Sequence, residues 1–538
     1  MIFFKNVTWL SSVFLDIWDE CEATMTTTEQ QPELGKLRRV FFPIHAYELK
    51  KALPMGVIFF LILFNYTCLR NIKDSLVVTA PNSGAEVLSF LKGYCVMPSA
   101  VLFMLIYAKA SDILSNEKLF YATLSPFILF FGAFGFIIYP NLDVLHPAAS
   151  TIAAWQANCS KALYWPLAIV GNWSYALFYV LAELWGSTIL SLSFWQFANQ
   201  ICKMSEAKRF YAFFGLVGQL SLLITGTLGE HFSKIPSNLN ANVDPWGVSL
   251  RWLMGIVFVA GILTMCIYRW IYTNVLTDKR LYDKPELPGV SRKKKAKVGF
   301  WQSIKIMATS PYLALIAALV ICYGVSVNLV EGLWKGQAKI LYPAANEFNS
   351  FMSRYVFYTG IVSLFVFIIG GNILRIFKWA TAAIITPILM FVAGSMFFAF
   401  ILFRGSFTEI LSNIGSSPVS CAVALGMSIL ILTKSTKYSL FDGTKEMAYI
   451  PLDEEMKVKG KVIVEVVGGR LGKAGGAWIQ SGLMMIIGLF SATAVKLTDI
   501  APYLFAVFLA VCGLWMFAVK GLSKKIEAVT AVQQAATQ

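Results

Sequence analysis

The chain has 538 residues, of which 57% are hydrophobic and only 14% are charged, and its formal net charge is +15. Soluble domains carry about a quarter of their residues as charged side chains, so this composition excludes a string of soluble domains. The sequence contains three His, and its nine Cys show no C-x-x-C spacing, which argues against a His-based metal site and against a zinc or disulfide framework. The composition therefore predicts an all-α polytopic membrane protein.

Residues 1–52 are expected to form a cytoplasmic N-terminal segment. The apolar stretch after Met1 is followed by the acidic run Asp16–Glu22, where a signal peptide would need small residues for cleavage. The acidic content also argues against a plastid transit peptide. Met25, which leads into an ordinary charged segment, is predicted to be the biological start in place of Met1.

Twelve apolar runs are long enough to cross a bilayer, whose hydrocarbon core of about 30 Å needs about 20 helical residues. The first six lie near Leu53–Leu69, Leu88–Ala108, Leu119–Tyr139, Tyr175–Ile201, Phe210–Gly229 and Leu250–Ile271. The second six lie near Tyr312–Glu331, Tyr355–Leu374, Trp379–Phe403, Val419–Thr433, Gly475–Val495 and Ile500–Val519. The stretch 162–202 is too long for one span, so Trp165, Pro166 and Trp173 are expected to form an interfacial lead-in to one long helix.

These spans divide the chain into an N-terminal six-helix bundle at 53–271, a cytoplasmic linker at 272–311, a C-terminal six-helix bundle at 312–519 and a cytoplasmic tail at 520–538. The linker carries the basic run Arg292–Lys297, a type of run that can contact lipid or nucleic acid. A solvated cytoplasmic loop is the preferred interpretation, and no nucleic-acid partner is expected.

The distribution of Lys and Arg predicts the orientation in the membrane. An even number of spans places both termini on one side, and the loops on that side hold most of the Lys and Arg, including Lys50, Lys51, Lys203 and Lys208. Because cytoplasmic loops are enriched in these residues, both termini are predicted to be cytoplasmic.

Two sets of matched residues suggest that the chain is an internal duplication. One set shares an offset of 257 residues: Pro54 with Pro311, Asn71 with Asn328, and Asp74 with Glu331. The other shares an offset of 261 residues: Arg209 with Arg470, Gly215 with Gly476, and Gln219 with Gln480. Duplicated bundles are common in transporters, so the pattern predicts a major-facilitator-like fold with a central site between the halves.

Several charged residues fall inside the predicted spans, where each would cost about 2.5–3.5 kcal/mol unless it met a wet cavity or a partner. They are Arg70, Lys73, Asp74, Lys92, Glu183, Glu331, Lys335 and Lys473. Glu183 is the clearest candidate because no other charge stands near it, although a hydrogen-bonded structural carboxyl is the alternative. Interfacial snorkelling is the alternative for Lys73 and Glu331, and it is the prediction for Lys92 and Lys335.

The Gly-rich segment VVGGRLGKAGGA at 466–477 fails as a phosphate-binding loop. Gly468 and Gly472 are one residue too close for GxxxxGK[ST], and Ala474 stands where Ser or Thr should be. Arg470 and Lys473 beside a predicted helix N-terminus could still attract phosphate. The alternative is that the glycines allow tight helix packing.

The charged set mixes the cations Lys73, Arg209, Arg470 and Lys473 with two carboxylates, Glu183 and Glu331, which suits a polyanion with a polar base better than a sugar or an apolar drug. The predicted translocation site comprises these six residues together with Asn71, Asp74, Gln219 and Gln480. No cofactor or metal is expected.

Five segments make the chain resemble the bacterial and plastidic nucleotide transporter family, the ATP/ADP translocases. They are FNYTCLRNIKDSLVV (64–78), NWSYALFYVLAELWGS (172–187), EAKRFYAFFG (206–215), SLFDGTKEMAYIPLDEE (439–455) and GGRLGKAGGA (468–477). The resemblance implies essential charges at Lys73, Glu183, Glu331 and Lys473, a major-facilitator-like fold without a cofactor, and, for a bacterial member, an inner-membrane location. A monomer is expected.

One departure from the family pattern bears on the substrate and on the coupling ion. Strict exchangers of this family typically read Arg-Asp-Thr-Lys-Asp, whereas this chain reads Arg-Asn-Ile-Lys-Asp at 70–74. The prediction is therefore a nucleoside triphosphate importer that works by alternating access, with protons as a candidate coupling ion. Strict ATP/ADP exchange is the alternative. A membrane nucleotide hydrolase is a remote alternative, because the acidic cluster Asp453–Glu455 has neither a His nor a second paired site.

Overall fold

A computed structural model describes residues 44–234, 244–278, 281–282, 310–413, 415–452, 460–461 and 464–537. The proposed start at Met25, the basic run Arg292–Lys297 and the acidic cluster Asp453–Glu455 lie outside the described residues. Every regular element in the described ranges is helical, so the prediction of an all-α chain is confirmed.

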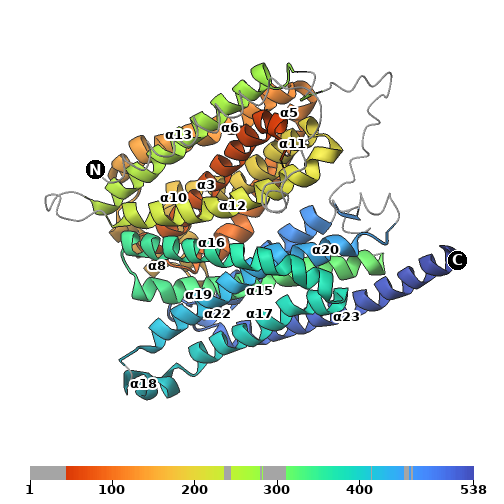
Figure 1. Cartoon of the computed structure of the whole chain (residues 1–538). Helices are drawn as coiled ribbons and strands as arrows, with labels where there is room; N and C mark the ends of the chain where they lie inside the picture. The colour runs from red at the N-terminus through yellow and green to blue at the C-terminus, as the bar shows by residue number, and fades with distance from the viewer. Residues whose placement is uncertain are drawn as a thin grey trace.

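Six long helical segments form the first half of the molecule (Figure 1). They are α3 (Leu49–Thr79), α4 (Val87–Phe90) continued by η2 (Leu91–Val96) and α5 (Met97–Ile113), α6 (Asn116–Ala133) with η3 (Phe134–Ile138), α10 (Trp173–Trp185) with η6 (Gly186–Phe194) and α11 (Trp195–Ile201), α12 (Met204–Ser233) and α13 (Pro245–Asn274). Short elements lie between them: η1 (Ala46–Glu48), η4 (Tyr139–Asn141), α7 (Leu142–Leu145), α8 (Ala149–Asn158), η5 (Lys161–Leu163) and α9 (Tyr164–Gly171).

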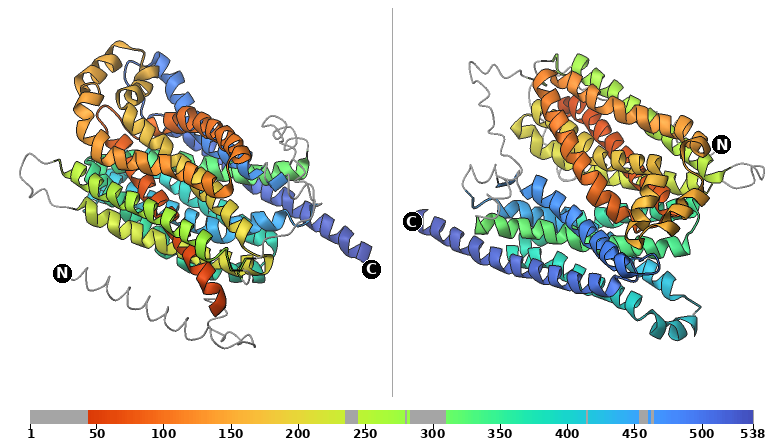
Figure 2. Two further views of the ribbon diagram at one scale, coloured as in Figure 1. Left: turned by 90° about the horizontal axis from the view of Figure 1, so that it is seen from above. Right: turned by 180° about the vertical axis from the view of Figure 1, so that it is seen from behind.

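The second half repeats this plan. Its long segments are α15 (Pro311–Leu341), α16 (Ala345–Ile376), α17 (Trp379–Leu402), α19 (Pro418–Thr436) continued by η7 (Lys437–Phe441) and α20 (Asp442–Ala448), α22 (Gly469–Phe490) preceded by η8 (Val464–Gly468), and α23 (Ala501–Thr537). The short α18 (Arg404–Asn413) joins α17 to α19. Figures 1 and 2 show the two halves stacked on each other along parallel helices.

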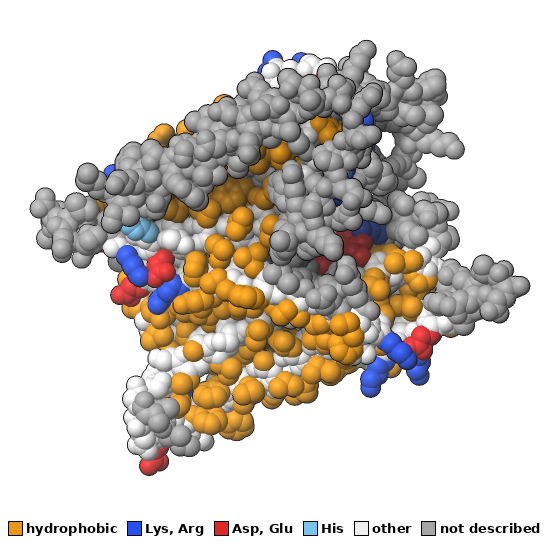
Figure 3. Space-filling model, viewed as in Figure 1, with side chains coloured by type: hydrophobic (Ala, Val, Ile, Leu, Met, Phe, Trp, Pro, Cys, Tyr) orange, Lys and Arg blue, Asp and Glu red, His pale blue; other side chains and the backbone are white. Residues whose placement is uncertain are grey.

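Ten of these segments are long and apolar enough to cross a membrane. The helices α16 and α22, with 32 and 22 residues, complete the twelve expected segments. Over the described residues these two helices are not among the ten. Figure 3 shows a broad band of hydrophobic side chains over the visible described surface, with charged side chains gathered toward its two ends. The chain is a multi-pass membrane protein.

Local sequence signals fix where several spans begin. In α13, α15 and α19 a Pro occupies the first turn, and the preceding residue caps the helix: Asp244, Ser310 and Ser417 each accept a hydrogen bond from a backbone N–H of the first turn. A side-chain cap followed by Pro is the favoured start of a helix, because Pro lacks the N–H that would be unpaired there.

The helix boundaries revise the offset between the halves. Both ends of α15 follow the corresponding ends of α3 by 262 residues, and Pro54 lies inside α3 whereas Pro311 begins α15. The predicted offset of 257 is therefore not the structural one for this pair of helices. The offset of 261 predicted from the Arg209 and Arg470 windows is within one residue of it.

At the face where α3 ends, side chains of one half donate hydrogen bonds to the backbone of the other. Trp165 in α9 is 7% exposed, and its indole N–H donates to the carbonyl of Val495 at 2.8 Å. Lys339 at the end of α15 donates to the carbonyl of Ser83 at 2.5 Å. Trp165 therefore closes the interface between the halves, and the predicted interfacial lead-in is a separate short helix that joins them at this face.

Candidate functional site

A central cavity of about 370 Å³ lies between the halves. Its charged lining comes from α3, η2, α10, α15, α19, η7, α20, η8 and α22, and comprises Arg70, Lys92, Glu183, Glu331, Lys434, Lys437, Asp442, Lys445, Glu465, Arg470 and Lys473. Tyr66, Tyr323 and Phe441 add aromatic surface. Seven of these charged side chains are basic and four are acidic, so the wall carries an excess of positive charge.

Glu331 is the centre of the deepest group of charges. The carboxylate of this residue, which is 5% exposed, lies 3.2 Å from Arg70, 3.2 Å from Lys335, 3.5 Å from Lys92 and 3.6 Å from Lys434. One carboxylate cannot neutralise four cations in a poorly solvated site, where charges interact much more strongly than in water. The arrangement leaves positive charge available to a bound anion.

Lys73 is enclosed behind this group. Its ammonium lies 2.8 Å from Asp74, 3.1 Å from Glu183 and 3.8 Å from the centroid of the Tyr179 ring. Asp74 also pairs with Lys335 at 2.8 Å, so the two groups of charges form one network. A buried charge is tolerated when its partners replace its water shell, and each of these buried charges has such partners.

A row of three lysines and one phenylalanine leads outward from Glu331 toward the face where α3 begins. Lys434, Lys437, Phe441 and Lys445 follow spacings of three or four residues along α19, η7 and α20, which places them on one side of a continuous helical segment that lines the cavity. Opposite them, the exposed Lys473 reaches the cavity from the second turn of α22.

The structure brings together some of the predicted site residues and separates others. Glu183, Glu331, Arg470 and Lys473 line the cavity, and Lys73 and Asp74 lie directly behind its wall. Asn71, Arg209, Gln219 and Gln480 do not line it.

Each of these four residues has a different environment. Arg209 of α12 instead pairs with Glu48, the last residue of η1, at 2.5 Å. Asn71 is 4% exposed within α3, and Gln480 donates to the carbonyl of Asn328 at 2.9 Å. The side-chain oxygen of Gln219 is buried without a hydrogen-bond partner among the described residues.

Three lysines contribute to the site against expectation. Lys92 donates to Asn328 at 2.9 Å and Lys335 is 1% exposed, so neither extends to the membrane interface as predicted. Lys434 lies just beyond the predicted span Val419–Thr433 and so in the predicted cytoplasmic loop, whereas α19 continues past it. The spacing of Lys434, Lys437 and Lys445 at helical intervals is the signal that could have identified the missed helix face.

The Gly-rich segment acts largely through packing. A Cβ on Gly324 would stand 2.8 Å from the carbonyl carbon of Gly472, and one on Gly476 would stand 2.8 Å from Cβ of Asn328. These contacts let α15 and α22 approach backbone to backbone, while Gly475 has only ordinary contacts. Tight packing and the presentation of Lys473 to the cavity thus coexist in one segment.

The described residues contain no group of His, Cys, Asp and Glu that could hold a metal ion.

Comparison with known proteins identifies the family. The profile of the family described as "TLC ATP/ADP transporter" matches residues 27–526. The chain belongs to the TLC ATP/ADP transporter family. It is therefore a nucleotide transporter and not an enzyme, and the resemblance inferred from the five sequence segments is confirmed.

Curated relatives of the transporter come from bacteria and from a plant. It is 47% identical to ADP,ATP carrier protein 1 of Chlamydia pneumoniae over 95% of this chain and 98% of the relative. It is 46% identical to ADP,ATP carrier protein 1 of Rickettsia prowazekii, covering 94% and 98% of the two chains. It is 42% identical to the chloroplastic ADP,ATP carrier protein 2 of Arabidopsis thaliana, covering 89% and 75%.

Solved structures share the fold of the transporter at low sequence identity. A bacterial homologue of the iron transporter ferroportin matches with a TM-score of 0.56 and 14% identity over 89% of this chain and 99% of that one. A D-xylose–proton symporter matches with a TM-score of 0.53 and 11% identity over 87% and 97%. These likenesses support the predicted major-facilitator-like fold.

Proposed function

We propose that this transporter exchanges ATP for ADP by alternating access about the central cavity. The observation that carries the proposal is the excess of basic side chains around Glu331, since this excess suits a ligand with several phosphates. Charge-assisted hydrogen bonds from Arg and Lys are the strongest that a protein offers to phosphate. The relatives named ADP,ATP carriers support the same substrates.

Exchange is favoured over the proton-coupled import of nucleoside triphosphates that the sequence predicts. That prediction rests on Asn71, which replaces an acidic residue of the family pattern. Asn71 is buried and does not line the cavity, whereas the neighbouring Asp74 keeps its ion pairs with Lys73 and Lys335. The substitution therefore does not change the charge on the cavity wall.

The carboxylates give the exchange its coupling. In the empty site Glu183 holds Lys73, and Glu331 holds Arg70 and Lys434. An incoming phosphate competes for these cations, and because Arg70 and Glu331 belong to different halves, the loss of their ion pair weakens the contact between the halves. An empty site keeps its ion pairs, and the transporter then does not change conformation. Each change from one orientation to the other therefore requires a bound nucleotide. Lys473, reaching the cavity from α22, would provide the first phosphate contact.

The location that we propose is the bacterial inner membrane, with both termini in the cytoplasm and the cavity facing the cytoplasm. The support is the bias of Lys and Arg toward the loops on the side of the termini. The face where α3 ends is closed by Trp165 and Lys339, so in this orientation the closed face points away from the cytoplasm. A monomer suffices, because one chain supplies both walls of the cavity.

Uptake of labelled ATP into proteoliposomes tests the proposal. We expect uptake only when the vesicles contain ADP or ATP, with no requirement for a proton gradient. Exchange that moves one net charge should respond to membrane potential by about 2.3 kcal/mol per 100 mV. Uptake into empty vesicles that is driven by a proton gradient would overturn the proposal of exchange. Equal competition by all four nucleoside triphosphates would favour the alternative of a transporter with broad nucleotide specificity.

Two substitutions test the assigned lysines. Lys473→Ala removes an exposed cation of the cavity and should lower ATP uptake while leaving thermal stability unchanged. Lys73→Ala should abolish uptake. Lys524→Ala, at an exposed position of α23, is the matched control and should transport normally. Normal transport by both cavity variants would remove these lysines from the site.

A further inference from the structure

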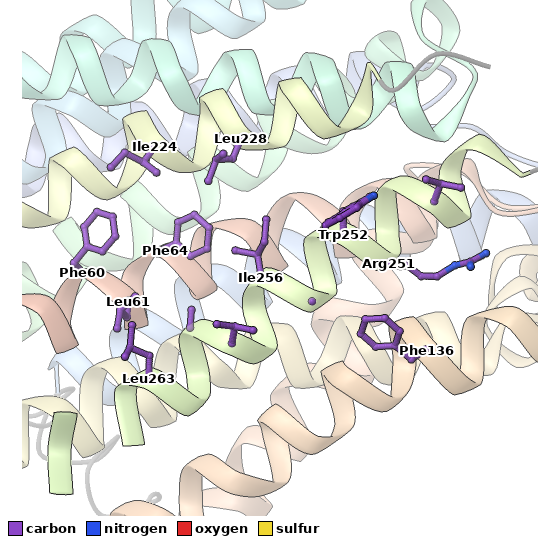
Figure 4. A pocket seen from close by; sticks show the side chains of 14 residues that line it. Phe60, Leu61, Phe64, Phe136, Ile224, Leu228, Arg251, Trp252, Ile256 and Leu263 are labelled. Carbon is purple, nitrogen blue, oxygen red and sulfur yellow. The ribbon is translucent and has the colours of Figure 1, made fainter. Parts of the chain in front are cut away.

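A second, apolar cavity lies on the side of the first half. It has a volume of about 750 Å³ and runs between α12 and α13, with Phe60 and Phe64 of α3 contributing to its floor. Figure 4 shows these rings flanked by Ile224 and Leu228 of α12, with Arg251 at one end of the row. Among the described residues that line the cavity, Arg251 alone is charged, so the cavity has one polar end.

The length of this groove corresponds to one leaflet of a bilayer. Along α13 its lining extends from Val248, near the start of the helix at Pro245, to Leu263. The twelve helical steps from Arg251 to Leu263 rise about 18 Å at 1.5 Å per residue. Half of a hydrocarbon core of about 30 Å is similar in depth. The groove therefore runs from the membrane surface to about the middle of the bilayer.

The polar end of the groove is suited to an anionic headgroup. Arg251 is exposed and forms no ion pair with another residue in the described ranges. The nearby acidic residue, Asp244, is already engaged, since it accepts hydrogen bonds from the Trp246 N–H at 3.0 Å and from the Tyr139 hydroxyl at 2.8 Å. Beside Arg251, the exposed Trp252 has the amphipathic ring that is enriched at membrane interfaces.

We propose that this groove binds one acyl chain of an anionic glycerophospholipid, whose phosphate contacts Arg251. An apolar cavity of this size is unfavourable for water, and it lies on a face that the bilayer surrounds. The lipid belongs to the leaflet in which α13 begins. The acyl chain fills the space between α12 and α13 and packs against α3, the helix that carries Lys73. It does not enter the charged cavity, which has a separate lining.

Native mass spectrometry of the full-length protein provides the test. The detergent-purified transporter is titrated with a phosphatidylglycerol and a phosphatidylcholine that carry identical acyl chains. We expect one retained phosphatidylglycerol and about fivefold weaker retention of phosphatidylcholine, the factor that corresponds to about 1 kcal/mol for one basic residue near an anionic surface. Equal retention of the two lipids would overturn the assignment of an anionic headgroup.

Two variants separate the headgroup contact from the groove. Arg251→Gln should reduce phosphatidylglycerol retention to the level of phosphatidylcholine, while Arg404→Gln, an exposed Arg after the end of α17, should leave it unchanged. Gly255→Leu places a side chain in the groove and should displace both lipids. Gly513→Leu is its matched control on an open face of α23. Wild-type retention in Arg251→Gln or in Gly255→Leu would overturn the proposal.

Discussion

Asp74 and Lys335 stand 261 residues apart and form a 2.8 Å ion pair between the two halves, with each side chain 1% exposed. Arg70 and Glu331, which pair at 3.2 Å, are also 261 residues apart. This is the offset that relates Arg209 to Arg470. In a duplicated fold, equivalent positions meet only near the axis that relates the halves, so this axis passes between α3 and α15. Opposite charges within one residue of equivalent positions join the halves there.

Breaking the Asp74–Lys335 pair should destabilise the transporter. Asp74→Asn leaves Lys335 with Glu331 alone, and we expect a loss of about 3 kcal/mol, because a buried charge that loses a partner is poorly compensated. The apparent unfolding temperature in detergent measures the effect. The double variant Asp74→Asn with Lys335→Met should recover much of the loss.

An exposed ion pair supplies the control for this experiment. Lys461 and Glu446 lie 2.6 Å apart with both side chains 47% exposed, so Glu446→Gln should cost less than about 1 kcal/mol. If Asp74→Asn were as mild as Glu446→Gln, the pair on the axis would not hold the halves together.

Lys434 should be a major phosphate contact. Its ammonium is buried without a hydrogen-bond acceptor in the described ranges, 3.6 Å from Glu331 and 5.0 Å from the Tyr355 ring centroid. Lys434→Ala should raise the KM for ATP about tenfold, since a hydrogen bond to a charged group contributes about 1.5–3 kcal/mol. Lys434→Arg should retain most of the affinity. An unchanged KM in Lys434→Ala, measured by uptake against ATP concentration, would contradict the assignment.

Closure of the face where α3 ends should depend on pH through Glu86. This carboxylate lies between α3 and α4, is 9% exposed and accepts a hydrogen bond from the Leu497 N–H of the other half at 3.2 Å. Burial raises its pKa, although the hydrogen bonds to backbone N–H groups and the charges of Lys339 and Lys496 oppose the rise. Opening would return the carboxyl to water and to its ordinary pKa, so the closed form binds the proton more tightly.

The sign of the effect follows from this difference. The stabilisation of the closed form is complete below the ordinary pKa of Glu and is lost as the pH rises through the raised pKa. Spin labels at Leu145 and Phe490, in a cysteine-free background, report the distance between the halves at this face. The closed population should increase as the pH falls, and Glu86→Gln should remove this response. A response that survives the substitution would assign the titration to another group.

The approach of α15 to α22 should not tolerate a side chain at Gly324. A methyl group there would stand 2.8 Å from the backbone of Gly472, so Gly324→Ala should separate the helices at a cost of about 1–3 kcal/mol. The apparent unfolding temperature and ATP uptake should both fall. Gly482→Ala on α22 meets no atom within 4 Å and should be neutral or slightly stabilising. Equal stability of the two variants would show that the close approach is not required.

The sequence by itself determined the class of protein and much of the chemistry. Low charge and apolar runs of about 20 residues predicted membrane-spanning helices, because a helix pairs its backbone N–H and C=O groups within its own segment. The cost of charge in lipid marked Lys73, Glu183 and Glu331 as functional candidates, and the last two line the cavity. The same reasoning missed Lys434, since a lysine near the end of an apolar run looks like part of a loop until the helix is seen to continue.

Only the tertiary structure decided which charged residues line the central cavity. Arg209 and Arg470 are equivalent by sequence offset, yet Arg209 pairs with Glu48 whereas Arg470 lines the cavity. The sequence predicts that Lys92 and Lys335 extend to the membrane interface. Their side chains instead point into the protein, because each pairs with a carboxylate of another helix, Lys92 with Glu331 and Lys335 with Asp74. A hydropathy pattern records how deep a residue lies along its own helix. The partner that makes a buried charge tolerable comes from a distant part of the chain, and only packing of the two halves supplies it.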